Sequence, residues 1–118
     1  MREFEVFFDR YPNSTLTSEV RERWREARSR LSEASYKVGL YYFRARWYPG
    51  AIDRFKEVLK DDPGYPNRDG VYYYLAESLV RTDKKAEALP YYDRLVKEFE
   101  RSEFLADAHR RIETLSVQ

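Results

Sequence analysis

The stretch that decides the fold runs from Ser32 to Pro63 and reads SEASYKVGLYYFRARWYPGAIDRFKEVLKDDP. Its first half carries apolar side chains at helical spacing, which predicts an amphipathic helix. Tyr48-Pro49-Gly50 is expected to interrupt that helix, because two turn-forming residues stand side by side. A second helix is predicted to follow and to end at Asp61-Asp62-Pro63-Gly64, since proline cannot continue a helix. The stretch therefore predicts a helical hairpin.

The hairpin resembles a tetratricopeptide repeat in the separations of five residues: Gly39, Tyr42, Ala51, Phe55 and Pro63. In that repeat a small residue on each helix lets the other helix approach closely, and large residues fill the remaining gap. The resemblance assigns the small residues to Gly39 and Ala51, and the large ones to Tyr42 and Phe55. It implies an all-α fold, a tetratricopeptide-repeat right-handed α-solenoid.

Three residues of the hairpin recur 37 positions later as small or aromatic side chains: Gly39 as Ala76, Ala51 as Ala88, and Phe55 as Tyr92 (76 − 39, 88 − 51, 92 − 55). The usual unit has roughly 34 residues, so the loop at 64–68 is expected to be longer than usual. The alternative is two unrelated hairpins, but three matching offsets in one register favour a repeat. We expect one repeat over 32–65 and a second over 69–101.

The residues before the first full repeat predict a single long helix over 15–46 that leads into it. Glycine and proline are absent from Thr15 to Val38, whereas an ordinary tetratricopeptide repeat would turn near Ala27. Apolar residues step by three or four without a break: Leu16, Val20, Trp24, Ala27, Leu31, Ala34, Val38, Tyr41 and Ala45. We expect this stripe to be the packed face of the helix.

The two ends of the chain are expected to complete the stack. Residues 1–13 predict the second helix of a partial repeat, with Phe4, Phe7 and Phe8 on one side. Residues 102–116 predict a capping helix with Ser102 at its N-cap, a role that the open end of a solenoid requires.

Composition argues against catalysis and against nucleic-acid binding. The chain of 118 residues has no cysteine and one histidine, His109, which excludes a His/Cys zinc site and a Cys–His pair. Its net charge is +1, with 22 basic and 21 acidic residues interspersed, so a clustered positive footprint is not expected. Asp61 and Asp62 are interpreted as solvated loop residues. The chain is predicted to be non-enzymatic and to need no cofactor or metal.

A closer resemblance covers nearly the whole chain, and it is to the C-terminal half of the BamD family. These are the tetratricopeptide lipoproteins of the bacterial outer-membrane β-barrel assembly machine. The unbroken long helix is one similarity. The sequence matches are Phe4-x-x-Phe7, Tyr11-Pro12-Asn13-Ser14, Arg30-Leu31, Glu33, Val38-Gly39, Tyr41-Tyr42 and Ala51-Ile52-x-Arg54-Phe55.

This resemblance implies a location on the periplasmic face of the outer membrane and a scaffolding role. In the family, the C-terminal repeats dock on the POTRA domain of the barrel-forming subunit and on a small lipoprotein. Members begin with a signal peptide, a lipid-bearing cysteine and two further repeats, none of which this sequence shows. The chain is therefore expected to be a fragment or a truncated relative.

Two surfaces are candidates for partner binding. The concave groove of a tetratricopeptide stack would be lined by Tyr36, Phe43, Tyr73, Glu77 and Arg81, which suits a generic adaptor that captures a peptide tail. The alternative for these aromatic residues is packing on the neighbouring helix. The second surface is the outside of the first hairpin, where Arg44, Arg46 and Arg54 lie near one break, and Arg54 falls within the BamD-like match.

Overall fold

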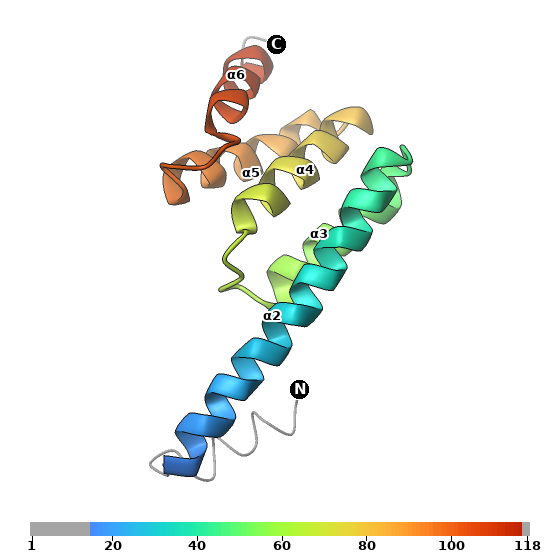
Figure 1. Ribbon diagram of the computed structural model, residues 1–118. Coiled ribbons are helices and arrows are strands. Elements are labelled where there is room, and N and C mark those ends of the chain that lie inside the picture. Colours follow the sequence, from blue (N-terminus) through green and yellow to red (C-terminus); the bar gives the residue numbers. More distant parts are fainter. Residues whose placement is uncertain (1–14, 117–118) are drawn as a thin grey trace.

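Five α-helices form the part of the chain that the computed structural model describes, residues 15–116 (Figure 1). They are α2 (Thr15–Arg44), α3 (Tyr48–Asp61), α4 (Arg68–Arg81), α5 (Lys85–Glu98) and α6 (Leu105–Ser116). Each helix packs against the next one in sequence, and these described residues contain no strand. The expected all-α stack of helical hairpins is confirmed.

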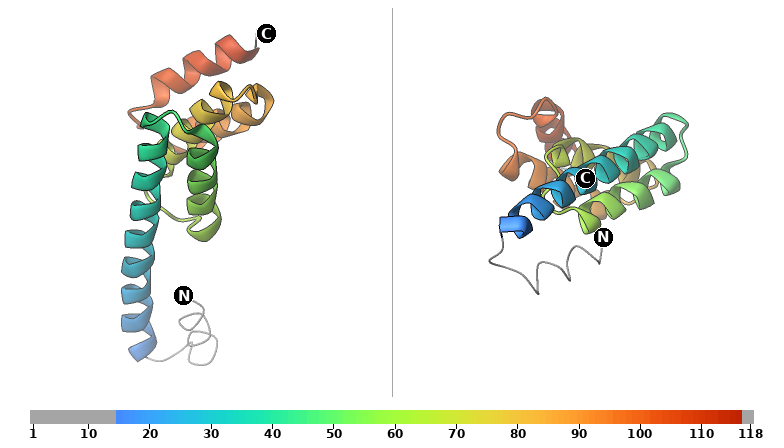
Figure 2. Two further views of the ribbon diagram at one scale, coloured as in Figure 1. Left: turned by 90° about the vertical axis from the view of Figure 1, so that its right-hand side faces the viewer. Right: turned by 60° about the horizontal axis from the view of Figure 1, so that its bottom comes forward.

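The stack is elongated because α2 extends well past its partner α3 (Figures 1 and 2). The principal extents are 54 × 28 × 21 Å. The prediction of one long helix is confirmed, since α2 runs for 30 residues with no turn near Ala27. It ends at Arg44 instead of residue 46. Residues 1–13, predicted to form a partial repeat, lie outside the described residues.

Close approach of the paired helices depends on the small residues that the repeat pattern picked out. A Cβ atom built on Gly39 would lie 2.5 Å from the Phe55 Cε1 atom, so α3 packs directly on the α2 backbone at this point. Ala51 and Phe55 are fully buried, and so are the equivalents of Gly39, Ala51 and Phe55 one repeat later: Ala76, Ala88 and Tyr92. The predicted repeat register is therefore also the register of the core.

The turn between α2 and α3 lies earlier than the sequence predicted. Tyr48, Pro49 and Gly50 form the first turn of α3, where proline is tolerated because its missing N–H would have no partner. The chain reverses instead at Arg46, which has φ 64°. The Trp47 N–H donates to the Tyr42 carbonyl at 2.8 Å, and the Arg46 N–H donates to the Phe43 carbonyl at 3.0 Å. These two bonds form a Schellman motif, which satisfies the last carbonyls of α2.

The turn between α4 and α5 has the same form 37 residues later (83 − 46). Asp83 has φ 62°, and the Lys84 N–H donates to the Leu79 carbonyl at 2.8 Å. Glycine is the usual residue at this left-handed position, because it lacks the Cβ that crowds the backbone there. Both hairpins of the stack therefore place a charged residue where the backbone favours glycine.

The packed face of α2 differs from the predicted apolar stripe. Leu31 and Tyr41 are 58% and 69% exposed, whereas Ser32 and Gly39 are buried. Small side chains face α3 because the two helices are close together, and several large apolar side chains are left on the outer side. The prediction that the apolar stripe is the packed face of α2 was wrong, because a different side of the helix faces α3.

The loop after α3 is anchored on α2 by a buried carboxylate. Ser32 Oγ donates to Asp62 Oδ2 at 2.8 Å, and only 9% of Asp62 is exposed. The Tyr65 N–H donates to the Asp62 carbonyl, and Tyr65 itself is buried. The expectation that Asp62 is solvated was therefore wrong. Ser32 of α2 supplies the hydrogen bond that permits burial of the Asp62 carboxylate.

The last helix closes the stack at the α4–α5 hairpin (Figure 2). Ser102 Oγ donates to Asp69 Oδ2 at 2.7 Å and accepts from the Phe104 N–H at 3.1 Å. The helix begins at Leu105, three residues after the predicted cap, and it buries Ala108 and Leu115.

Candidate partner-binding surfaces

The three aromatic residues predicted to line the groove contact other aromatic residues of the stack. Each of the three is half-buried. The ring pairs and their centroid distances are Tyr36 and Phe55 at 6.0 Å, Phe43 and Tyr74 at 5.1 Å, and Tyr73 and Phe104 at 4.8 Å. Their packing joins α2 to α3 and α4, and α4 to the loop before α6. A partner-binding role for these three residues stays a prediction.

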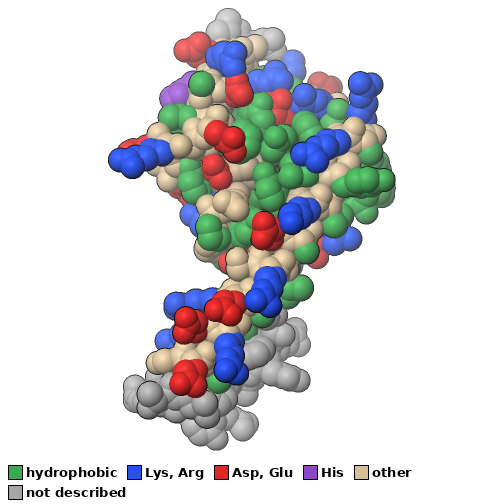
Figure 3. Space-filling view, viewed as in Figure 1, with side chains coloured by type: hydrophobic (Ala, Val, Ile, Leu, Met, Phe, Trp, Pro, Cys, Tyr) green, Lys and Arg blue, Asp and Glu red, His purple; other side chains and the backbone are tan. Residues whose placement is uncertain are grey.

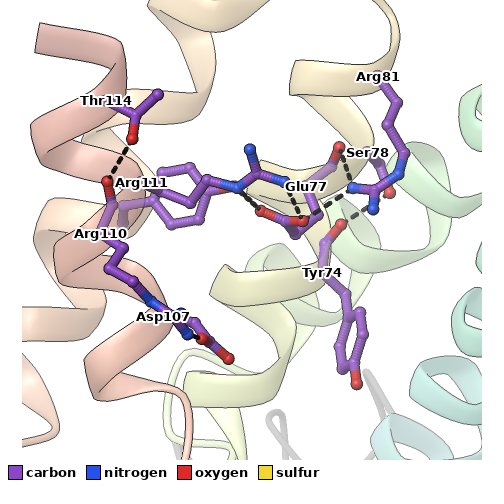
Figure 4. A network of polar contacts seen from close by, with 9 residues as sticks. Tyr74, Glu77, Ser78, Arg81, Asp107, Arg110, Arg111 and Thr114 are labelled. Carbon is purple, nitrogen blue, oxygen red and sulfur yellow. Dashed lines mark hydrogen bonds and ion pairs between the residues drawn. The ribbon is translucent and has the colours of Figure 1, made fainter. Parts of the chain in front are cut away.

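Glu77 on α4 is the centre of a buried polar network (Figure 4). The residue is 3% exposed, and Arg111 of α6 donates to both of its carboxylate oxygens, from Nε at 2.8 Å and from Nη2 at 2.9 Å. Arg81 Nη1 donates to Oε1 at 2.9 Å, and the Tyr92 hydroxyl of α5 donates to Oε2. One carboxylate thus connects three helices, and bidentate binding by arginine fixes its orientation.

The network keeps Glu77 ionised. Burial alone would raise the pKa of its carboxyl group, but hydrogen bonds from Arg111, Tyr92 and Arg81 outweigh burial and hold the pKa below its ordinary value. Burial, together with the hydrogen bond to the Glu77 carboxylate, raises the pKa of the Tyr92 hydroxyl. Glu77 is therefore a charged structural residue whose oxygens are already occupied.

Arg81 lies between this network and the first hairpin. Its guanidinium carbon is 5.0 Å from the Phe43 ring centroid and 5.8 Å from the Tyr48 ring centroid. The structure therefore brings Phe43, Glu77 and Arg81 together, as the groove prediction required. Both Arg81 and Arg111 pair with the single Glu77 carboxylate, so the network keeps a net charge of +1 although each guanidinium already has an internal partner.

The three arginines predicted on the outside of the first hairpin lie on three different parts of it. Arg44 is the last residue of α2, Arg46 is the left-handed turn residue, and both are exposed. Arg54 lies on α3, with 42% of its side chain exposed and Nη1 3.6 Å from Glu57 Oε2. An exposed pair of this kind contributes little, in the range of about 0–1 kcal/mol. Arg54 is therefore free to change partners.

Exposed aromatic residues lie beside these arginines, and the sequence analysis did not single them out as a site. Trp47 is 56% exposed, and its ring lies 4.7 Å from the Tyr42 ring. The Tyr42 ring in turn lies 6.0 Å from Tyr41. Figure 3 shows hydrophobic side chains gathered at this end of the hairpin, with lysine and arginine side chains beside them. The signal was present in the sequence as Arg46-Trp47 next to the turn, but the stripe prediction placed Tyr41 in the core.

The described residues hold no cluster of histidine, cysteine, aspartate or glutamate suited to a metal ion. His109 lies on α6 and is exposed. Between Thr15 and Ser116, none of the helices combines the length and apolar character that crossing a membrane requires. The two surfaces described above present aromatic and arginine side chains.

Comparison with known proteins agrees with the fold. Residues 71–102 match the tetratricopeptide repeat, and residues 1–80 match a family described as outer membrane lipoprotein. The outer membrane protein assembly factor BamD of Xylella fastidiosa is 27% identical over 86 residues, which is 73% of this chain and 29% of that protein. The chain thus spans less than a third of the length of the curated relative it matches. Because the family match covers more than half of its residues, the chain belongs to the outer membrane lipoprotein family, of which BamD is a member.

Proposed function

We propose that this chain is a non-enzymatic scaffold that docks to other subunits of the machinery that assembles outer-membrane β-barrel proteins. Its relative is named as an assembly factor, and the families that it matches are interaction scaffolds. The docking surface of the proposal is the outside of the α2–α3 hairpin, at Arg44, Arg46 and Arg54.

The observation that carries this proposal is the contrast between the two sets of arginines. In the groove, Arg81 and Arg111 are committed to the buried Glu77. On the hairpin, neither Arg44 nor Arg46 forms an ion pair with any described residue. Arginines without internal partners are available to hold a partner's carboxylates, and the planar guanidinium can do so through two hydrogen bonds.

The proposed partner is a folded periplasmic domain with carboxylates at its surface. By the resemblance to the BamD family, we expect this domain to be a POTRA domain of the barrel-forming subunit, with a small lipoprotein as a second partner. Arg54 is the residue we expect to contribute most, because it lies on the rigid α3 and breaks only a weak surface pair on binding.

Arg54→Glu tests the proposal. We expect it to weaken binding of the POTRA domain by about 2 kcal/mol, roughly thirtyfold, because it leaves a partner's charge unpaired in the interface. The melting temperature should barely change, since the residue makes only an exposed contact with Glu57. Isothermal titration calorimetry measures the affinity. Arg101→Glu, a charge reversal at an exposed position in the loop before α6, is the matched control.

The groove is tested in the same titrations with Arg110→Ala. Arg110 lies on α6 and lines a pocket together with the groove residue Tyr73, and its ion pair with Asp107 lies on the surface, so its loss should leave the fold intact. Tyr73→Ala is less suitable, because it removes the ring that stacks on Phe104. Loss of binding in Arg110→Ala with full binding in Arg54→Glu would contradict the proposal and move the site to the groove.

A further inference from the structure

We propose that the hairpin arginines form the edge of a larger docking surface, whose centre is apolar and whose occupant is a protein domain that presents apolar side chains flanked by carboxylates. This hairpin face consists of Leu31, Val38, Tyr41, Tyr42, Trp47 and Arg54. The inference rests on the proposed function, which it extends from the charged residues to the apolar anchor.

One helix row of α2 forms the first side of the hairpin face. Leu31, Ser35, Val38 and Tyr42 are separated by four, three and four residues, so they share one side of the helix. Leu31 is exposed, and Ser35, Val38 and Tyr42 are half-exposed. Tyr42 packs against the hydrophobic core with part of its surface, whereas Leu31 and Val38 are not part of that core.

The exposed tip of the hairpin connects this row to α3. The Tyr42 ring lies 4.7 Å from the Trp47 ring, and a Cβ atom built on Gly50 would lie 2.9 Å from Trp47 Cε3. The indole therefore lies over the first turn of α3. Arg54 follows Gly50 by four residues, one turn further along the same side of the helix. The aromatic tip and Arg54 thus belong to one surface.

The other end of the surface is a cavity of about 440 Å³ between α2 and the last turns of α3. Leu31, Ser35, Glu57, Val58 and Asp61 contribute to its lining. Glu57 is the residue paired with Arg54, so the cavity adjoins the arginine. The cavity has room for an apolar side chain of a partner, as the central pocket of an interface commonly does.

Charge complementarity identifies the occupant. Arg44 and Arg46 lie in the sequence between Tyr42 and Trp47 of the aromatic tip, and within residues 15–116 they have no ion-pair partner. A contiguous exposed apolar patch edged by charge is typical of a protein interface, and aromatic residues and arginine are the side chains that interfaces favour. Carboxylates on the partner would meet the arginines while its apolar residues cover Tyr41 and Trp47.

The backbone of the turn provides a way to test this assignment. Arg46 occupies a left-handed conformation in which any side chain costs stability and glycine does not. Asp83 has the same conformation at the equivalent position of the second hairpin and is not one of the residues of the hairpin face, so it supplies a matched control.

Trp47 can report directly on the surface. The chain has two tryptophans, so Trp24→Phe leaves Trp47 as the single reporter. Addition of the POTRA domain of the barrel-forming subunit, in a form whose own tryptophans have been replaced by phenylalanine, is expected to shift the emission of Trp47 to shorter wavelength, because the indole passes from water into an interface. Trp47→Ser and Tyr41→Ser, each made in the natural chain, are measured by isothermal titration calorimetry with the same domain. Each should weaken binding at least tenfold and change the melting temperature by only a few degrees.

A glycine pair isolates the side chain at the turn. Arg46→Gly removes the guanidinium and relieves the strained backbone, so the variant should be more stable than the natural chain yet bind several-fold more weakly. Asp83→Gly should be equally stabilised and bind normally. Normal binding by Arg46→Gly would exclude its side chain from the interface.

The outcomes separate this inference from the proposed function. Weak binding by Arg54→Glu together with normal binding by Trp47→Ser and Tyr41→Ser would overturn the apolar surface and leave the charged docking site standing. Normal binding by Arg54→Glu with no change in Trp47 emission would overturn both. A hairpin face that instead joins two copies of this chain would appear in analytical ultracentrifugation as a dimer that Trp47→Ser dissociates, and that result would also overturn the proposed occupant.

Discussion

Replacing Gly39 by alanine places a methyl group where α3 packs on α2. The new Cβ would lie 2.5 Å from Phe55 Cε1 and 2.8 Å from Cδ1, about 1 Å closer than carbon atoms normally approach. The Phe55 ring is fully buried between the rings of Tyr36 and Tyr74, so it cannot move aside without displacing them. Overpacking of this kind costs about 1–3 kcal/mol, and the lack of free space here favours the upper end.

Alanine also offers a gain, because it is the better helix former by about 1 kcal/mol. The net expectation is therefore a loss of about 2 kcal/mol, which corresponds to a fall of roughly 8 °C in melting temperature for a domain of this size. Urea denaturation followed by circular dichroism measures the free energy of unfolding. Gly64→Ala is the matched control, since a Cβ there meets no atom within 4 Å and the variant should be as stable as the natural chain. A Gly39→Ala chain that equals or exceeds the natural stability would refute the packing argument.

Two further predictions concern stability. Glu77→Gln removes the charge that Arg111 and Arg81 share, and it should cost about 2 kcal/mol at pH 7. Because the folded-state pKa of Glu77 lies below 4.5, the network stabilises fully above that value, and the stability difference between the natural chain and the variant should shrink in urea titrations as the pH falls below 4.5. For residues 1–13, replacing Phe4 and Phe8 by serine should lower the melting temperature or dissociate a dimer, because exposed aromatic rings are costly to leave in water. If neither the melting temperature nor the sedimentation coefficient changes, these phenylalanines contribute to neither stability nor association.

Repeat register and helix length were predictable because both leave a periodic record in the sequence. The 37-residue offset linked residues that prove to be buried at equivalent places, such as Ala51 and Ala88. The unbroken run of α2 past Ala27 followed from the absence of glycine and proline between Thr15 and Val38. Both inferences depend on local backbone preferences, and the packing of the helices agrees with these preferences.

The direction of α2 around its axis was not predictable from periodicity alone. Counting apolar residues selected Leu31 and Tyr41, whereas the close helix approach at Gly39 turned Ser32 inward. A stripe of large apolar residues on a helix can mark a core or an interface, and only the neighbouring helices distinguish the two. The aromatic tip of the candidate site was missed for this reason.

The buried polar contacts could not be predicted from the sequence either. Ser32 and Asp62 are 30 residues apart, and Glu77 and Arg111 are 34 apart. Each residue looks like an ordinary surface residue until the stack brings its partner to it. The groove prediction grouped Glu77 with Arg81, but it did not include the ion pairs that Glu77 forms with Arg81 and Arg111.

The unbroken course of α2 has a mechanical consequence. A helix of 30 residues spans about 45 Å and bends sharply only at residues such as proline or glycine, which are absent from Thr15 to Val38. The two ends of the stretch from Thr15 to Val38 are thereby held at a fixed distance and orientation from each other, as on a rigid rod. If a bound protein displaced one end of this stretch, the other end would turn with it as a rigid body, because no flexible residue lies between the two ends.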